Sequence, residues 1–381
     1  MGPDSCHDIA DLRAAARRRL PRGLFEYVDR GCDGDVGIAR NRAAFEAITF
    51  APRVLQGVAQ RSTASTLFGQ NLSMPAAIAP MSPAGLLWHE GEGKLAAAAR
   101  AAGIPYTLPT ESMTRLEAIS ATMAGSPWWF QLYVWVDKAT SFRLVERVAE
   151  AGASVLLLTV DTAVAPHRAF NYRNGFATPF KPRPRNLTDM LLHPGWLIGT
   201  MGRYALTTGV PRMLNHPGSP GALQGSGPAS KLNGGITWDD VAALRRVWPG
   251  KLLVKGILRA DDARRAIEAG ADGVVVSNHG ARNLDGATAS ITALPAIAAE
   301  IGQHGSILLD SGIRHGADIA RALALGADAV LLGRAVLFGL AAYGQAGAAR
   351  ALHLLRHEFE TAMALLGAAS PGEITRDMVR P

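Results

Sequence analysis

The sequence predicts a (β/α)8 barrel, in which eight parallel strands close into a cylinder that the connecting helices cover. One unit recurs with small variations: an alanine-rich helix, a glycine-containing turn and a short apolar run, as in Glu150–Thr159, Glu268–Ser277 and Leu325–Gly333. The glycine suits the left-handed position that ends a helix. The apolar runs are continuous rather than alternating, which indicates strands covered on both faces, as in a parallel sheet.

Eight such runs occur along the chain, and each is predicted to be a strand. They span Ala76–Pro80, Pro105–Pro109, Trp129–Val134, Val155–Asp161, Leu252–Gly256, Gly273–Asn278, Ile307–Ser311 and Ala329–Gly333. Helices are predicted between most of them, over Gly93–Ala102, Phe142–Ala151, Asp239–Trp248, Asp262–Ala269 and Ala317–Leu325. Eight units of one hand favour a closed barrel. A doubly wound open sheet is the alternative, but it does not need eight strands, and no Gly-x-Gly-x-x-Gly follows the first of them.

Two segments lie outside the repeat in what we take to be a single domain of residues 1–381. Residues 1–75 are predicted to form a helical N-terminal extension, with helices over Leu12–Leu20 and Leu24–Asp29. Residues 176–235 form a long insertion after the fourth strand, and loops of that length are usually functional or mobile. The barrel and its closing helices span 76–366, with one or two helices after Arg334.

The composition excludes several classes of protein. The chain of 381 residues is 48% hydrophobic and 19% charged, which excludes a disordered chain. Its two cysteines, Cys6 and Cys32, exclude a disulfide scaffold and favour a reduced compartment. No run is long and apolar enough for a spanning helix, and the N-terminus lacks the apolar core of a secretory signal. We therefore expect a cytoplasmic protein that contacts a membrane, if at all, from its inner face.

The net charge of +7 is concentrated in one segment. Between Arg168 and Lys231 there are eight basic residues and a single acid, Asp189, so the rest of the chain is neutral. A nucleic-acid-binding protein would spread its basic residues along a face and interleave aromatic side chains. We therefore expect no nucleic-acid partner.

The same segment suggests a membrane contact. Residues 181–212 contain the apolar and aromatic run Met190–Ile198, flanked by Arg183, Arg185 and Arg203. An apolar patch within basic surroundings suits anionic lipid headgroups. A solvated lid, whose charges attract an anionic substrate, is the alternative interpretation.

Polar residues at the carboxyl ends of the predicted strands are the candidates for function, because barrel enzymes build their active sites there. The seventh and eighth strands end in glycine-containing turns that carry Arg314 and Arg334. Backbone N–H groups and arginines at these two ends predict a site for a phosphate-bearing ligand. The alternative is that both arginines are surface residues and both glycines only form turns.

A second group of strand-end residues predicts an anion site with an acid–base residue. His279 and Arg282 are at the end of the sixth strand, Tyr133 is at the end of the third and Arg168 follows the fourth, so they could face one small anion. The forked guanidinium group of arginine binds both oxygens of a carboxylate. Asp161 could orient His279 and favour its protonated form. Structural ion pairs are the alternative, and no zinc-ligand spacing is present.

These residues, in this order, resemble the family of FMN-dependent α-hydroxy acid dehydrogenases and oxidases over almost the whole chain. The matching stretches are Phe25–Tyr27, Asn41–Phe45 with Pro52-Arg53, Trp129–Tyr133, Leu158–Thr162, Leu253–Gly256, Ser277–Arg282, Leu309–Arg314 and Leu332–Arg334. The run Ser-Asn-His-Gly-x-Arg after a predicted strand is the most specific of them.

The resemblance implies an activity. It implies FMN-dependent oxidation of an L-2-hydroxy acid, similar to lactate or mandelate, to the 2-oxo acid, with electrons passed to a quinone or another carrier. The alternatives are an oxidase that produces hydrogen peroxide, and a flavin-binding barrel with a maturation or binding role. The resemblance also implies a homo-oligomer, namely a tetramer, and no metal.

The resemblance also implies roles for individual residues. His279 would be the base, with Asp161 stabilising its imidazolium form, whether the α-hydrogen leaves as a hydride or as a proton. The substrate would be held by Arg168, Arg282, Tyr27 and Tyr133. The flavin ring would contact Ala79, Pro80, Met81, Ser82, Pro109, Gln131, Thr159, Lys255 and Ser277. The ribityl phosphate would be held by Asp310, Ser311, Gly312, Arg314, Gly333 and Arg334.

The sequence departs from the family pattern at five positions. Pro109 replaces a serine that contacts the flavin, and because proline donates no hydrogen bond, Thr110 or water must substitute or the contact is missing. Trp88-His89 stands where members usually have His-Pro, and Ala281 replaces a second glycine. Ser82 occupies a position near the flavin that is usually Ala or Gly. None of these changes removes a catalytic group.

Overall fold

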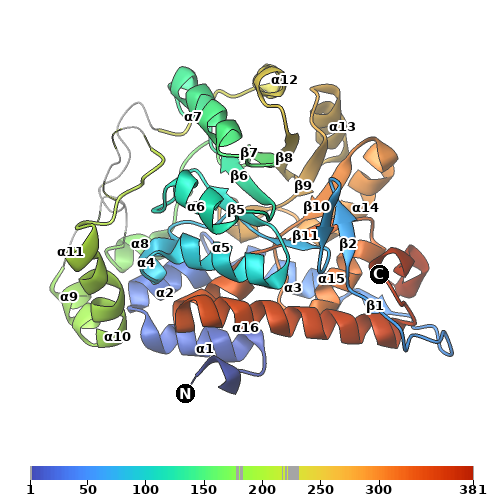
Figure 1. Ribbon diagram of the computed structural model, residues 1–381, viewed down its shortest axis with the longest axis horizontal. Coiled ribbons are helices and arrows are strands. Elements are labelled where there is room, and N and C mark those ends of the chain that lie inside the picture. Colours follow the sequence, from blue (N-terminus) through green and yellow to red (C-terminus); the bar gives the residue numbers. More distant parts are fainter. Residues whose placement is uncertain are drawn as a thin grey trace.

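The protein, described here from a computed structural model, contains a closed barrel of eight parallel strands. The described residues are 2–176, 180, 183–216, 218, 221 and 231–380. Within them the strands follow the order β10-β11-β4-β5-β6-β7-β8-β9 around the barrel (Figure 1). Their bounds are β4 (Ala76–Ile78), β5 (Tyr106–Pro109), β6 (Trp128–Leu132), β7 (Val155–Thr159), β8 (Lys251–Ile257), β9 (Gly273–Val276), β10 (Ser306–Leu309) and β11 (Ala329–Leu332). All eight predicted strands are present, and the predicted fold class is confirmed.

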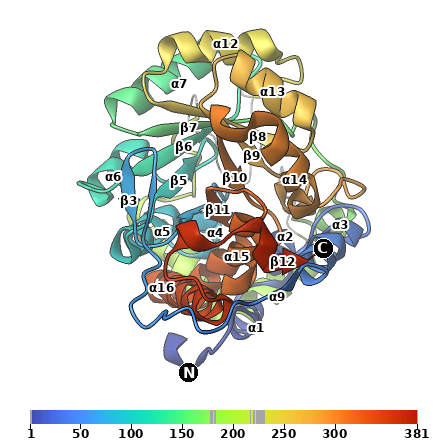
Figure 2. The ribbon, with the colours of Figure 1, turned by 90° about the vertical axis from the view of Figure 1, so that its right-hand side faces the viewer.

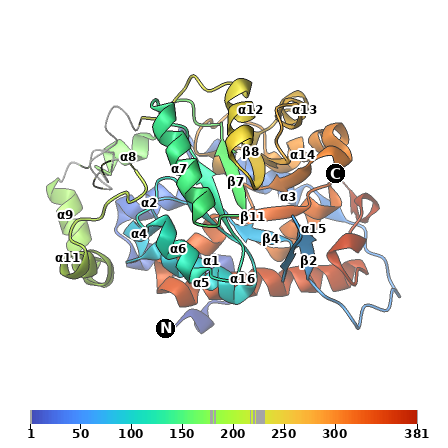
Figure 3. The same cartoon turned by 45° about the horizontal axis from the view of Figure 1, so that its top comes forward.

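Helices cover the outside of the barrel, as Figures 2 and 3 show. They are α5 (Gly91–Ala102), α6 (Leu116–Thr122), α7 (Lys138–Glu150), α12 (Trp238–Val247), α13 (Ala260–Glu268), α14 (Ser290–Ile301), α15 (Gly316–Ala324) and α16 (Arg334–Leu366). The five predicted connecting helices are confirmed, and α6 and α14 are additional. Short 3-10 turns complete the described chain at η1 (Pro3–Ser5), η4 (His279–Ala281), η5 (Gly302–His304), η6 (Pro371–Glu373) and η7 (Arg376–Met378).

The closing helix α16 consists of two helical segments. Tyr343 and Gly344 interrupt it with non-helical backbone angles. Gly344 has a φ of +65°, and a Cβ atom there would lie 2.6 Å from the ring of Trp88. Glycine is therefore required at the break, because only glycine adopts this conformation without strain and leaves room for the ring.

A β-hairpin closes the amino-terminal end of the barrel. The strands β2 (Ser65–Leu67) and β3 (Gln70–Leu72) place Leu67 and Leu72 against the barrel interior, where the cluster includes Trp129 and Val155 at the starts of β6 and β7. Such short strands carry too little periodicity to be predicted from sequence. Because this end is filled, ligands can reach the barrel core from the opposite end.

The N-terminal extension is helical only in its first part. Helices α1 (Ile9–Arg19) and α2 (Arg22–Asp29) confirm the two predicted helices, and α3 (Val36–Glu46) is a third. The remainder is not helical, contrary to the prediction for residues 1–75: it contains the β2–β3 hairpin and β1 (Thr49–Phe50), which pairs antiparallel with β12 (Val379–Arg380). The extension therefore also ties down the C-terminal strand.

Much of the described insertion is helical rather than a structureless loop. After α8 (Ala169–Arg173) it forms α9 (Pro184–Leu191), α10 (Pro194–Trp196), the π-helix η2 (Leu197–Gly202) and α11 (Arg203–Thr207). These helices pack beside α4 (Ala84–Leu87) and α1: Trp196 Nε1 donates to the Leu86 carbonyl at 2.7 Å, and Arg19 Nη2 donates to Thr200 Oγ1 at 3.0 Å. Lys181, one of the basic residues of the proposed membrane contact, lies outside the described residues.

No helix in the described ranges combines the length and the apolar character needed to cross a bilayer.

Candidate active site

A cavity of about 400 Å³ lies at the carboxyl ends of the barrel strands. Every predicted substrate and cofactor residue lines it except Asp161 and Ser277, which lie behind the cavity wall. The lining also includes Val28 of α2 and Leu232 near the end of the insertion. The fold therefore brings together residues that are separated by more than two hundred positions in the sequence.

His279 stands between an acid and a phenol. Its Nδ1 atom lies 2.8 Å from Asp161 Oδ1, and its Nε2 atom lies 3.4 Å from the Tyr133 hydroxyl. The backbone of His279 has a φ of +57°. Non-glycine residues in this region are strained, and such strain clusters at functional sites. Hydrogen bonds from His279 N to Ser277 Oγ at 3.0 Å and from Gly280 N to Ser311 Oγ at 2.8 Å hold the turn.

The carboxylate beside His279 is ionised. Burial opposes ionisation of Asp161, but attraction to His279 and Lys255 outweighs it and lowers the pKa of the carboxyl group. Asn283 Nδ2 donates to the Asp161 carbonyl at 2.9 Å and holds the loop in place. Burial, followed by the charge of Asp161, raises the pKa of Tyr133, so its hydroxyl stays protonated and can donate a hydrogen bond.

Two arginines form an anion site beside the histidine. The Arg282 guanidinium lies 4.8 Å and that of Arg168 5.9 Å from the centre of the Tyr27 ring. Arg282 Nη1 donates to the Tyr27 carbonyl at 2.6 Å, and Arg168 Nη2 donates to the Arg282 carbonyl at 3.2 Å. Burial and then the charge of Arg168 lower the pKa of Arg282 to about 10. Two neighbouring cations that are held by neutral carbonyls favour a bound carboxylate.

A deeper part of the cavity combines a buried cation with unpaired polar atoms. Lys255 Nζ lies 3.1 Å from Asp310 Oδ2 and donates to Ser277 Oγ at 3.0 Å. Burial lowers the pKa of Lys255, but Asp310 and Asp161 outweigh burial and raise it overall. Gln131 Nε2 and Thr159 Oγ1 are buried and have no hydrogen-bond partner among the residues that the structure describes. Buried polar atoms of this kind indicate a missing ligand.

The ends of β10 and β11 present cations to the far end of the cavity. The described partner of the Arg314 guanidinium is the carbonyl of its neighbour Ile313 at 2.8 Å, and burial with repulsion from Arg42 lowers its pKa to about 10. Gly333 caps the start of α16, where free N–H groups and the helix dipole favour an anion. This combination suits a phosphate group.

Arg334 has a contact that the sequence did not predict. Its Nε, Nη1 and Nη2 atoms donate to the carbonyls of Val28, Gly280 and Arg30 at 2.8, 2.8 and 2.9 Å. The side chain thus joins α2 to the turn that carries His279. Burial, followed by the charge of Arg282, lowers its pKa well below the usual value.

Thr110 does not replace the serine contact that Pro109 lacks. Its hydroxyl donates to the Gln131 carbonyl at 2.7 Å and accepts from the Tyr133 backbone N–H at 2.9 Å. The residue is fully buried and does not line the cavity. The suggestion that Thr110 substitutes for the missing donor is therefore wrong, and Thr110 instead positions the end of β6.

Sequence reasoning missed four polar residues that line the cavity, namely Glu111, Thr162, Asn171 and Asn283. Asn283 follows the His279 motif, and Glu111 lies two residues beyond β5; both line the cavity. Position relative to the strand end, the same signal that identified Gln131 and Tyr133, could have identified Glu111.

The fold and the cavity define a barrel enzyme that holds a phosphate-bearing cofactor beside an anionic substrate. Residues 16–381 match the family of FMN-dependent dehydrogenases, and the chain belongs to this family.

Curated relatives and solved structures resemble the chain over nearly its full length. It is 43% identical over 371 residues to an L-lactate dehydrogenase of Azorhizobium caulinodans and 40% identical to one of Pseudomonas aeruginosa, with 96% of both chains covered in each case. The crystal structure of the monotopic membrane protein (S)-mandelate dehydrogenase superimposes with a TM-score of 0.91 at 35% identity, covering 98% of this chain and 99% of that one. A mandelate oxidase superimposes with a TM-score of 0.82 at 36% identity, covering 98% of each chain.

The residues of the cavity fit FMN. Gln131 Nε2 and Thr159 Oγ1 need hydrogen-bond partners, which a flavin ring would supply. Lys255 offers a cation to the polar edge of such a ring, and Arg314 with the start of α16 offers a phosphate site.

Proposed function

We propose that the chain oxidises an L-2-hydroxy acid to the 2-oxo acid with FMN as the electron acceptor. The observation that carries the proposal is the convergence of the His279–Asp161 pair with Arg168 and Arg282 on one cavity. The curated relatives are named L-lactate dehydrogenases and the structural neighbours mandelate dehydrogenase and oxidase, which supports a lactate- or mandelate-like acid.

In this proposal the substrate carboxylate binds the guanidinium groups of Arg168 and Arg282. The protonated hydroxyl of Tyr133 donates to the substrate, and Tyr27 contributes its phenol beside the two arginines. These contacts place the reacting carbon near His279 Nε2, which accepts the proton that the substrate gives up. FMN, when bound, supplies the two-electron acceptor.

Asp161 stabilises the charge that His279 gains. Because the carboxylate is anionic and lies 2.8 Å from Nδ1, it orients the ring with Nε2 toward the cavity and stabilises the imidazolium. Lys255 holds a positive charge in the deeper part of the cavity, where it would favour negative charge on the bound cofactor.

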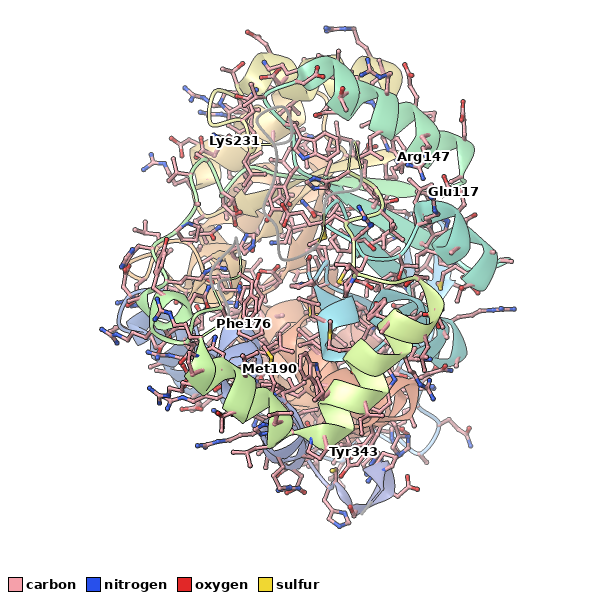
Figure 4. All side chains as sticks on the ribbon, turned by 90° about the vertical axis from the view of Figure 1, so that its left-hand side faces the viewer. Glu117, Arg147, Phe176, Met190, Lys231 and Tyr343 are labelled. Atoms are coloured by element: carbon pink, nitrogen blue, oxygen red, sulfur yellow. The ribbon has the colours of Figure 1, made fainter. Side chains whose placement is uncertain are left out.

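We also propose that electrons pass to a quinone or another carrier at the inner face of a membrane, which the described helices of the insertion contact. On α9, η2 and α11 or just after them, the exposed apolar residues are Leu187, Leu191, Leu192, Ile198, Leu206 and Val210, and the same segment exposes Arg183, Arg185 and Arg203. Figure 4 shows these helices in front of the barrel. Trp196, expected in the apolar patch, is instead buried against α4.

Anionic lipids would attract this surface by about 1 kcal/mol per basic residue near the headgroups.

We also propose that the chain forms a tetramer, as the family resemblance implies. Light scattering measures the oligomeric state.

The experiment that tests the oxidation is anaerobic bleaching of the bound flavin by a panel of L- and D-2-hydroxy acids. Bleaching by L-acids alone supports the proposal. A yellow protein that no 2-hydroxy acid bleaches contradicts it and favours a flavin-binding barrel with another role.

A further inference from the structure

Glu111 lies on the cavity wall opposite the histidine. It follows β5 by two residues, and its side chain lines the cavity. In the barrel order β10-β11-β4-β5-β6-β7-β8-β9, β5 and β9 are four strands apart, which places them on opposite sides of the cylinder. A ligand that is held by Arg282 and His279 after β9 and reaches across the cavity would therefore direct its far end toward Glu111.

The backbone of Glu111 is held, while its carboxyl group has no hydrogen-bond donor among the described residues. Ser82 Oγ donates to the Glu111 carbonyl, which fixes the loop. Within the described chain no donor reaches the carboxyl oxygens: the nearest basic side chain is His216, whose Nε2 lies 4.0 Å from Glu111 Oε1, beyond hydrogen-bond length. Burial lowers the pKa of His216 to about 4, so its ring is neutral at pH 7.

The described lining contains one other acid, and that acid, unlike Glu111, is paired with a cation. Among the described lining residues the acids are Glu111 and Asp310, and Asp310 is paired with Lys255 at 3.1 Å. The Glu111 side chain keeps 35% of its surface accessible, and that surface faces the cavity. Burial, opposed by the charge of Arg168, raises its pKa. A half-buried acid without a donor is costly unless a ligand supplies one.

We infer, on the basis of the proposed function, that Glu111 determines substrate specificity by accepting a hydrogen bond from the side chain of the 2-hydroxy acid. The preferred substrates then carry a hydrogen-bond donor, such as a hydroxyl group, at the end remote from the carboxylate. An apolar side chain leaves the carboxyl group of Glu111 unpaired, and a second carboxylate on the substrate is repelled by it. This specificity is a property of the wall formed by β4 and β5, separate from the groups that perform the oxidation.

Matched pairs of acids test the inference on the FMN-loaded, full-length protein. L-glycerate and L-lactate differ by one hydroxyl group, as do L-4-hydroxymandelate and L-mandelate. We expect kcat/KM, measured by anaerobic flavin bleaching, to favour the hydroxylated member of at least one pair by about tenfold or more, since sites built around a hydrogen bond discriminate strongly. Equilibrium binding of hydroxypyruvate and pyruvate measures the same preference without turnover.

Substitutions of Glu111 test whether this residue, and not another part of the cavity, causes the preference for hydroxylated acids. Glu111→Val should abolish the preference, and Glu111→Gln should retain part of it, because the amide oxygen still accepts. The control Glu117→Val removes an acid from α6, where Glu117 pairs with Arg147 at 2.6 Å on the outer surface (Figure 4), and should leave the ratio unchanged.

Two results overturn the inference: equal kcat/KM within both pairs in the wild type, or an unchanged ratio in both Glu111 variants while the flavin still bleaches. If no 2-hydroxy acid bleaches the wild-type flavin, the proposed function fails, which is a different result.

Discussion

Asp161 Oδ1 lies 2.8 Å from His279 Nδ1, across a gap of more than one hundred residues in the sequence. The contact joins the end of β7 to the turn after β9 and leaves Nε2 of the ring facing Tyr133 and the cavity. The same carboxylate lies near the buried Lys255, so one anion stabilises both the base and the cation beside the cofactor site.

Replacing the histidine tests the assignment of the base. His279→Gln should retain bound flavin, because the described contacts of the cofactor site do not include its imidazole, and should slow anaerobic bleaching by about 10²–10⁴-fold. The visible spectrum of the purified variant reports the flavin, and stopped-flow absorbance reports bleaching. Bleaching at the wild-type rate would refute the assignment.

Asp161→Asn should reveal a pH-dependent contribution to stability. The pKa of Asp161 in the folded protein is below its ordinary value of 3.8, so its ionised form stabilises the fold at neutral pH. The wild type should therefore have the larger free energy of unfolding above about pH 4, and the difference should shrink as the pH falls through the lowered pKa. Urea unfolding from pH 7 to pH 3 measures this, and a difference that grows toward low pH would contradict it.

Arg314→Met should weaken FMN binding but leave the stability of the apoprotein almost unchanged. The described guanidinium contacts include no carboxylate, so its removal costs the folded chain little, whereas a charged hydrogen bond to phosphate contributes about tenfold to a hundredfold in affinity. Fluorescence titration of apoprotein with FMN gives the dissociation constant. Arg259→Met, which removes an exposed arginine paired with Asp261, is the control and should leave the constant unchanged.

Membrane contact through the insertion predicts salt-sensitive binding to vesicles. The protein should co-sediment with anionic vesicles at low salt and much less at high salt, because salt screens the arginines. Leu191→Glu should reduce binding, because Leu191 is 68% exposed in the same segment as these arginines and a carboxylate there would be repelled by anionic lipids. Leu365→Glu changes a leucine that is 71% exposed near the end of α16, away from α9–α11 (Figure 1), and should bind as the wild type does. Wild-type binding that is absent or insensitive to salt would contradict the contact.

The electron acceptor can be identified after anaerobic bleaching by substrate. We expect the flavin colour to return faster on mixing with a quinone analogue than on mixing with air-saturated buffer. Faster recovery with oxygen, accompanied by hydrogen peroxide, would assign the chain as an oxidase instead.

Much of the site was predictable because it follows local rules. Continuous apolar runs predicted all eight barrel strands, and polar residues at or just beyond their carboxyl ends, such as Gln131, His279 and Arg314, line the cavity as expected. Trp196 shows where local rules fail: it occurs in an apolar, basic-flanked run typical of a membrane surface, yet it is buried with its indole N–H bound to Leu86.

The sequence by itself determined the barrel and the set of residues at its mouth, because strand periodicity and strand-end position are properties of neighbours in the chain. The tertiary structure alone decided the rest: that β2 and β3 close the amino-terminal end, that Arg334 joins α2 to the His279 turn, and that Glu111 lines the cavity with no donor to its carboxyl group in the described part of the chain. These features depend on contacts between residues far apart in the chain, and such contacts form only when packing fixes the distances between elements.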